Sequence, residues 1–134
     1  MIQEAYVSFE TAKLLKEKGF DWPTVYHYIN SDELQHEIEF TSFKNSDMLN
    51  AYAAPTHQMA CAWLREKGIF IGIRPRLSFT DYYYITAYIY RMEDLDSLYH
   101  KEKVTRYSCI AQCDDSSYEE AVEAALKYVL ENLI

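Results

Sequence analysis

The stretch "FTDYYYITAYIYRM", residues 79–92, decides the fold that we expect for this chain, and it holds five of the 13 tyrosines. Apolar residues and tyrosines alternate along it. Because successive side chains of a β-strand point to opposite faces, this period of two predicts a single strand. Its inward face would carry Ile85, Ala87 and Ile89. Its reverse, which we call the tyrosine face, would carry Tyr82, Tyr84, Tyr88 and Tyr90.

The elements expected around this strand follow the order helix, three strands, helix. Further strands are expected at residues 69–79 and 104–113, and a charged loop at residues 93–103. Helices are expected near 55–67 and 117–133, the second opened by a capping box at Ser116 or Ser117. The buried side of this last helix is expected to consist of Tyr118, Ala121, Val122, Ala125, Val129 and Leu133.

Double-stranded RNA-binding domains have the same order of elements, with both helices on one side of a three-stranded sheet. If the topology is shared, the tyrosine face lies on the open side of that sheet. The function is not expected to be shared, because the last helix begins "DDSSYEEAVEA" where those domains carry a lysine-rich segment. Acidic side chains there would repel a phosphate backbone.

The first third of the chain predicts a helix followed by a β-hairpin. Ser8 is a candidate N-cap, and Gly19 follows the last helical turn. Alternating patterns at residues 22–30 and 33–43 predict two strands with one wet face. The polar segment from residue 44 to residue 54 reads as a connection.

We therefore expect one α+β domain over residues 1–134, with an antiparallel sheet packed on two to three helices in the order α-β-β-α-β-β-β-α. It would consist of an N-terminal α-β-β unit (1–45) and an α-β-β-β-α unit (52–134). The segments "TAKLLKEKGF" (11–20) and "ACAWLREKGI" (60–69) align without a gap. Either a true duplication or a shared way of ending helices explains this similarity.

Composition and charge restrict the class of protein. Thirteen basic and 21 acidic residues give a net charge of -8, which disfavours nucleic-acid partners. The acidic surface serves solubility or meets a basic partner. The odd number of cysteines and the absence of a leader pattern favour a cytoplasmic location. No apolar run approaches the ~20 residues of a membrane span, so no membrane is expected.

No catalytic residue, metal site or cofactor is predicted. His36-Glu37 begins a zinc-protease pattern, but Phe40 occupies the place of the second histidine. His57 and Cys61 are spaced one helical turn apart, yet nothing supplies an orienting acid or an oxyanion turn. Cys109 and Cys113 lack the spacing of a redox or zinc motif.

The tyrosine face is the candidate binding site, and three roles stay open for it. The N-terminal hairpin or a second subunit could cover it, bases or sugars could stack on it, or another protein could dock there. Arg74 and Arg76 share one strand face and would either bind an anion or pair with acidic side chains. The candidate binding residues are Tyr82, Tyr84, Tyr88, Tyr90, Arg74 and Arg76.

Three segments carry a resemblance: "YVSFETAKLLKEKGFD", "YAAPTHQMACAWLREKGIFIGI" and "SYEEAVEAALKYVLENLI". Together they resemble small uncharacterised proteins of bacteriophages and mobile elements of Bacteroides-type gut bacteria. The most specific motif occupies residues 52–67, and "GIFIGIRPRL" departs from the polar, histidine-containing turn usual in that group. The resemblance implies a phage- or mobile-element-derived accessory protein and carries over no site residue.

From these observations we expect a non-enzymatic protein that acts by protein–protein interaction, with a host protein or by self-association. The alternative is a nucleic-acid or nucleotide binder that uses the tyrosine face.

Overall fold

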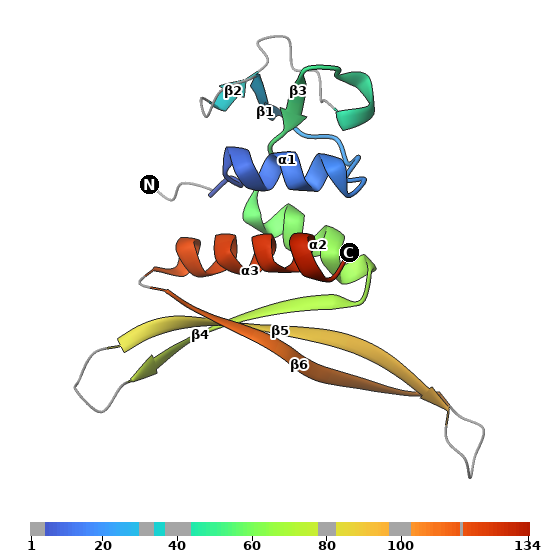
Figure 1. The fold of residues 1–134 in the computed structure, drawn as a ribbon, viewed down its shortest axis with the longest axis vertical. Coiled ribbons are helices and arrows are strands. Elements are labelled where there is room, and N and C mark those ends of the chain that lie inside the picture. The colour runs from blue at the N-terminus through green and yellow to red at the C-terminus, as the bar shows by residue number, and fades with distance from the viewer. Residues whose placement is uncertain (1–4, 30–33, 37–43, 78–82, 97–102, 116) are drawn as a thin grey trace. The chain divides into compact units, whose positions relative to one another are not determined.

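A computed structural model of the chain describes residues 5–29, 34–36, 44–77, 83–96, 103–115 and 117–134 (Figure 1). Three α-helices and two antiparallel sheets make up these residues, which confirms the α+β class. The chain divides into two compact units, Met1–Ala60 with Leu126–Ile134, and Cys61–Ala125. We call them the first unit and the second unit. This division differs from the expected one, and the single-domain organisation stays a prediction.

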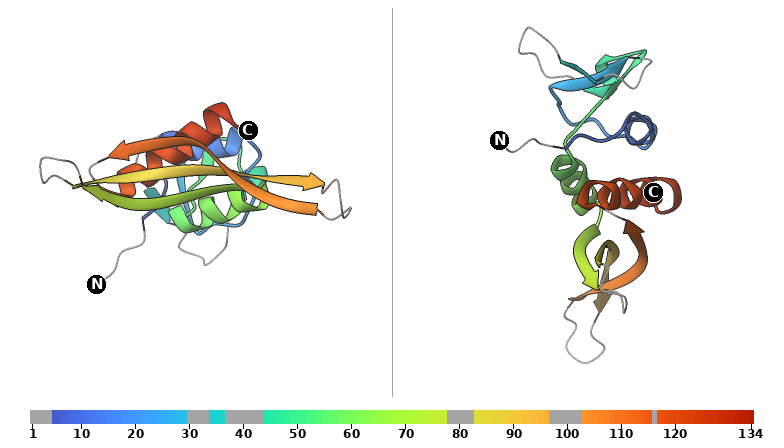
Figure 2. Two further views of the ribbon diagram at one scale, coloured as in Figure 1. Left: turned by 90° about the horizontal axis from the view of Figure 1, so that it is seen from below. Right: turned by 90° about the vertical axis from the view of Figure 1, so that its left-hand side faces the viewer.

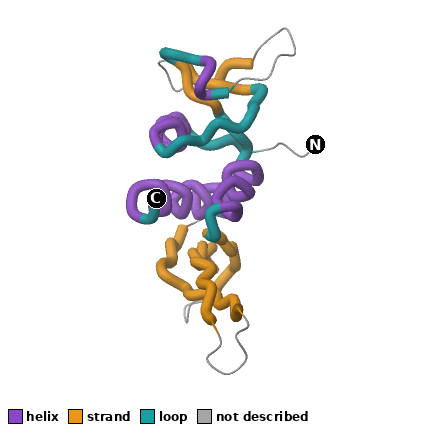
Figure 3. Tube along the Cα trace, turned by 90° about the vertical axis from the view of Figure 1, so that its right-hand side faces the viewer, coloured by secondary structure: helices purple, strands orange, loops and turns teal. Residues whose placement is uncertain are grey.

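The first unit contains α1, a 3₁₀ turn and a three-stranded sheet of order β2-β1-β3 (Figures 1 and 3). Its elements are α1 (Phe9–Glu17), β1 (Tyr26–Ile29), β2 (Leu34–His36), η1 (Asn45–Asp47) and β3 (Ala51–Ala53). As predicted, the Ser8 hydroxyl oxygen caps α1 by accepting from the Thr11 amide at 3.2 Å. Gly19 ends the helix with φ of 94°, a left-handed conformation that favours glycine.

An aromatic cluster joins α1 to the sheet of this unit. The Phe9 ring lies edge-on to Tyr28 and Tyr52, at 5.5 and 5.7 Å between ring centroids. Tyr28 and Tyr52 are register partners on β1 and β3. The Tyr28 hydroxyl donates to the Val7 carbonyl at 2.8 Å, so this buried ring has its polar atom satisfied inside the fold.

The expected hairpin of β1 and β2 forms, but the expectation of one wet face is wrong for β1. His27 and Tyr28 point to opposite faces of the strand, and both are buried. The Phe9 ring of α1 packs on Tyr28, and the Tyr28 hydroxyl donates to the Val7 carbonyl, which accounts for the burial of Tyr28.

Strand β3 lies in the segment that was predicted to be a connection, so that prediction is wrong there. The Ala54 amide donates to Tyr26, which means that the Ala53 amide and the Ala51 carbonyl point away from β1. The Ala53 amide donates to the Asn45 side chain at 2.8 Å, and Lys16 Nζ donates to the Ala51 carbonyl at 2.8 Å. Two side chains thus close the outer edge of β3, which would otherwise leave polar groups without partners.

The second unit contains a three-stranded antiparallel sheet of order β4-β5-β6 (Figure 2). Its strands are β4 (Ile69–Leu77), β5 (Tyr83–Asp96) and β6 (Lys103–Asp115). The unit also holds the last part of α2 (His57–Glu66) and the first part of α3 (Tyr118–Asn132). These helical segments lie on one side of the sheet, as the predicted order of elements requires (Figures 1 and 2).

β5 and β6 extend beyond the ends that the sequence suggested at residues 92 and 104. Asp94, Leu95 and Asp96 pair with residues 103–105, so part of the predicted charged loop is strand. Cross-strand pairing outweighs the charge of these residues. A register shift between Ile89 and Tyr90 marks an irregularity in the β5–β6 ladder.

Helix α3 begins where the capping box predicted. The Ser117 hydroxyl oxygen accepts from the Glu120 amide at 3.2 Å, whereas Ser116 lies outside the described residues. Tyr118 is 55% exposed, so its predicted place in the buried face is wrong. It is the first residue of the helix and precedes the turn whose side chains are buried. Those buried side chains are Ala121, Val122, Ala125, Leu126, Val129 and Leu130.

Among the described helices, none combines the length and the hydropathy that crossing a bilayer requires.

Candidate functional site

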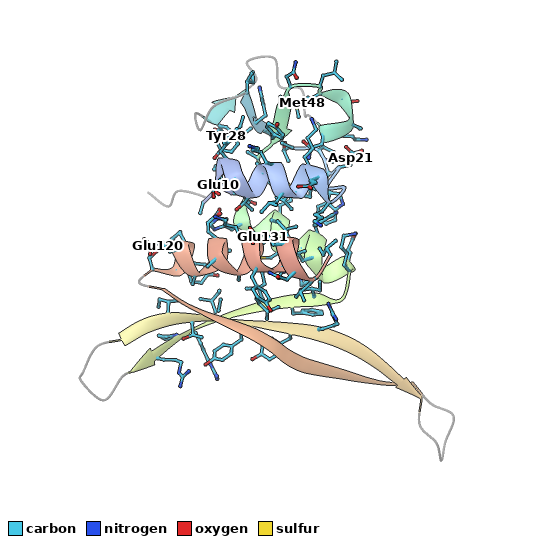
Figure 4. The ribbon with its side chains drawn as sticks, in the orientation of Figure 1. Glu10, Asp21, Tyr28, Met48, Glu120 and Glu131 are labelled. Atoms are coloured by element: carbon cyan, nitrogen blue, oxygen red, sulfur yellow. The ribbon has the colours of Figure 1, made fainter. Side chains whose placement is uncertain are left out.

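The register of β4 and β5 places two arginines on the tyrosine face. Arg74 pairs with Thr86 and Arg76 with Tyr84, while Gly72 pairs with Tyr88. Paired residues share a face of the sheet. Side chains drawn on this side of the sheet project away from the helical segments of the unit (Figure 4).

Burial separates the two faces of β5 as the alternation predicted. Ala87 and Ile89 are fully buried, whereas Tyr88 and Tyr90 are half-buried. Ile85 and Thr86 depart from the pattern: Ile85 is half-buried although it was expected on the inward face, and Thr86 is fully buried although it belongs to the tyrosine face. No described element of the second unit covers Tyr88 and Tyr90.

Arg74, Tyr88 and Tyr90 form a row of stacked groups, which we call the Arg–Tyr–Tyr row. The Arg74 guanidinium carbon lies 4.8 Å from the centroid of the Tyr88 ring. The rings of Tyr88 and Tyr90 lie 6.4 Å apart and 28° from parallel. A cation held over an aromatic face in this way is attracted by the negative potential of the ring.

Arg74 remains a cation under all ordinary conditions. A side-chain hydrogen bond with Tyr88 raises the pKa of Arg74, and the proximity of Tyr88 and Tyr90 contributes to the rise. Among the residues that the structure describes, no carboxylate pairs with this guanidinium. The side chain of Asp114, which pairs with Thr86 on the next strand, is not described, so both roles considered for the arginines stay predictions.

Gly72 supports the row from β4. A Cβ atom at this position would lie 3.5 Å from Cε2 of Tyr90, an ordinary van der Waals distance. The Tyr90 ring therefore lies over the glycine backbone, where it shields a strand position that has no side chain of its own. Sequence reasoning missed this residue, although its spacing of two from Arg74 indicates the same face.

The remaining candidates of the tyrosine face are only partly described. Tyr82 lies outside the described residues. Tyr84 belongs to β5 opposite Arg76, but its side chain is not among those described. The observed cluster therefore consists of Arg74, Tyr88 and Tyr90, with Arg76 exposed on the same face.

The thiol considered for catalysis has the wrong electrostatics for a nucleophile. Desolvation by burial raises the pKa of Cys61, and the nearby Arg65 offsets this only in part. A thiol with a raised pKa stays protonated near neutral pH, whereas the thiolate is the reactive form. His57, one turn earlier on α2, is buried.

The structure gives little support to the metal and redox patterns considered in the sequence. Within the described part of the chain, no group of three or more histidine, cysteine or acidic side chains is placed to hold a metal ion. Glu37 lies outside that part, and the side chains of His36, Cys109 and Cys113 are not described.

Comparison with known proteins adds no assignment to this geometry. No protein-family model, no curated protein and no solved structure matches the chain.

Proposed function

We propose that this chain is a non-enzymatic accessory protein that binds another protein through the tyrosine face. The observation that carries the proposal is the Arg–Tyr–Tyr row, which stands half-exposed on the side of the sheet away from the helical segments of its unit. The resemblance to phage and mobile-element proteins supports a host protein as the partner. The odd number of cysteines supports a cytoplasmic location.

Tyrosine and arginine suit this role because they combine large contact areas with polar ends. Both are enriched at the centres of protein interfaces, where a few residues supply most of the binding free energy. A tyrosine ring has few rotatable bonds, so ordering it on binding costs little entropy. Tyr88 and Tyr90 also stand on a paired strand, which holds the rings in place before a partner arrives.

One observation favours the alternative, a nucleic-acid or nucleotide binder. The two rings are close to parallel, and bases stack on such surfaces for about 1–3 kcal/mol each. The charge of the chain opposes this alternative. A net charge of -8 and the exposed Glu119 and Glu120 at the start of α3 repel phosphates.

Site-specific photo-cross-linking tests the proposal. The photoreactive amino acid p-benzoylphenylalanine would replace Tyr90 in one variant and Tyr128 in a matched control. Tyr128 is a partly exposed tyrosine on α3, outside the tyrosine face. After irradiation in an extract of Bacteroides-type cells, we expect a discrete protein adduct from the residue-90 variant alone.

Two results would contradict the proposal. One is the absence of an adduct at residue 90, and the other is the same set of adducts at residues 90 and 128. Loss of the adduct when a single-stranded oligonucleotide is added would favour the alternative instead.

A further inference from the structure

The ends of β5 and β6 pair with each other and with no third described strand. Residues 92–96 of β5 lie opposite residues 103–107 of β6, and we call these paired ends the β5–β6 arm. The last residue of β5 that pairs with β4 is Arg91, opposite Ile69, where β4 begins. In Figure 1 the arm runs past the start of β4. The edge of residues 92–96 on the β4 side therefore has no partner strand among the residues that the structure describes.

An open edge of this kind is a backbone binding site. The amides and carbonyls of a strand point to its two sides in alternation. Pairing with β6 satisfies one side of residues 92–96, and a third strand would supply the ladder partners of the other side. A ribbon of two strands is only marginally stable in water, whereas a third strand adds to its stability. The arm therefore gains from an added strand.

The register inside the arm shows which residues suit residues 92–96 as strand neighbours. Glu93 pairs with Arg106. Asp96 pairs in the same way with Lys103, so two acidic positions of β5 stand opposite basic positions of β6. Opposite charges at facing positions stabilise a sheet, and like charges destabilise it. A strand added at the other edge meets the same two faces of β5, so basic residues suit it as well.

Asp94 is the acidic position of the arm whose strand neighbour is neutral. It pairs with Thr105 of β6. The chain as a whole is also acidic, with a net charge of -8. A basic residue opposite Asp94 on an added strand would gain a cross-strand pair and would be attracted by the whole chain. Local and overall charge thus favour the same occupant.

A second copy of β5 is a poor occupant of this edge. In an antiparallel self-pairing centred on Asp94, this residue would stand opposite its own copy. A shift by one residue places Glu93 opposite Asp94 or Asp96. Acidic residues on an edge strand discourage such pairing and admit a strand of opposite charge. A second copy of β6 would bring basic residues, but its contact with β5 is head-to-tail and would continue from copy to copy.

We infer that the open edge of residues 92–96 binds an extended basic segment of another protein by strand addition, with a lysine or arginine opposite Asp94. In strand addition, the main-chain hydrogen bonds supply affinity and the alternate side chains supply specificity. The arm is a second interaction surface, because it uses neither Tyr88 nor Tyr90. Its binding does not depend on a partner at the tyrosine face.

Four synthetic peptides test the inference on the full chain. In the first, lysine alternates with valine and threonine, and in the second, glutamate replaces lysine. The third and fourth are the lysine peptide with N-methyl groups on its even or its odd backbone amides. Binding is measured by fluorescence anisotropy of the labelled peptides.

The expected results follow from charge and from the ladder. We expect the glutamate peptide to bind about tenfold more weakly than the lysine peptide, because like charges would face each other. An added strand uses every other amide of its backbone. One pattern of N-methylation should therefore abolish binding, whereas the other should change the dissociation constant by less than about threefold.

Charge reversal assigns the effect to the arm. Asp94→Lys should weaken the lysine peptide about tenfold and strengthen the glutamate peptide. Glu119→Lys is the matched control, because Glu119 is an exposed acid of the same unit at the start of α3. It changes the net charge by the same amount and should bind each peptide as the wild type does.

Three results would overturn the inference: equal binding of the lysine and glutamate peptides, equal behaviour of the two methylated peptides, or equal loss in Asp94→Lys and Glu119→Lys. Sedimentation of the chain alone separates the remaining occupant. Concentration-dependent association that Asp94→Lys abolishes would assign the edge to a second copy and would overturn the choice of partner. None of these results bears on the adduct expected at residue 90.

Discussion

Replacing Asn45 with alanine should destabilise the first unit strongly. The Asn45 side chain is 6% exposed and makes two hydrogen bonds of 2.8 Å. Its amide donates to the Phe20 carbonyl, which follows α1, and its carbonyl accepts from the Ala53 amide on the outer edge of β3. One side chain therefore ties the end of α1 to a strand.

The expected loss follows from those two bonds. Asn45→Ala leaves the Ala53 amide, which is buried, without its acceptor, and a buried donor in that state costs about 1–3 kcal/mol. Losing the bond to the Phe20 carbonyl adds about 1 kcal/mol. We expect the free energy of unfolding to fall by about 2–4 kcal/mol, a large part of the stability of a small protein.

Urea denaturation followed by far-UV circular dichroism measures this change. With a urea dependence of about 2 kcal/mol per molar, the midpoint should fall by about 1–2 M. Asn132→Ala is the matched control, since Asn132 also donates from its side chain to a backbone carbonyl, that of Tyr128, but at an exposed position. An exposed bond of this kind should be worth less than about 0.5 kcal/mol.

Equal effects of Asn45→Ala and Asn132→Ala would refute the reasoning, because burial would then add nothing to the bond. A loss below about 1 kcal/mol would also refute it, since it would mean that water replaces the side chain at the β3 edge.

Three further predictions concern the N-cap of α1, the Arg–Tyr–Tyr row and the dependence of stability on pH. Ser8→Ala should lower the free energy of unfolding by about 1 kcal/mol through loss of the α1 N-cap, and Ser8→Asp should restore most of it. Gly72→Ala should be neutral or stabilise the protein by up to about 1 kcal/mol, whereas Tyr90→Ala should destabilise it. Thermal unfolding compares the two variants, and the reverse order of stability would contradict the stacking of Tyr90 on Gly72. Hydrogen bonds from the Ser46 amide and hydroxyl lower the pKa of Asp21 below its ordinary 3.8. The contribution of the Asp21 carboxylate to the free energy of unfolding is therefore complete above pH 3.8 and is lost as the pH falls through the lowered pKa. Asp21→Asn should flatten the acid side of the profile of stability against pH. Urea titration at several pH values measures this profile.

Local features of the sequence predicted the helices well because the chemistry that ends a helix lies within a few residues of its end. Ser8, Gly19 and Ser117 act where the sequence placed them, at the boundaries of α1 and α3. The same holds for Gly68 after α2, which has φ of 80°. Each of these positions is determined by the backbone conformation of one turn.

The strand β3 could not be predicted because its stability comes from residues that are distant in the sequence. It has three residues, Ala51 to Ala53, too few for a periodic pattern. Its outer edge is closed by Lys16 from α1 and by Asn45 from the 3₁₀ turn. Neither hydrogen bond can be recognised from the sequence around β3, because each forms only when the folded chain brings β3 back to α1 and the 3₁₀ turn.

The strand face that carries the candidate residues was predictable from the sequence, but the contacts between those residues were not. Alternation alone placed Tyr88 and Tyr90 on one face of β5 and Ala87 on the other. The position of Arg74 beside Tyr88 depends on the register of β4 against β5, which pairs Gly72 with Tyr88. The hydrophobic pattern of β4 does not fix that register, so the contact between Arg74 and the Tyr88 ring became visible only in three dimensions.

The two groups of tyrosines differ in their burial and in their polar neighbours. In the first unit, the Tyr28 hydroxyl donates to the Val7 carbonyl inside the fold, so that ring completes a core. On the tyrosine face, the polar neighbour of Tyr88 is the exposed cation of Arg74. The composition counts both groups alike, whereas the structure separates a buried ring with an internal partner from two half-buried rings beside an exposed arginine.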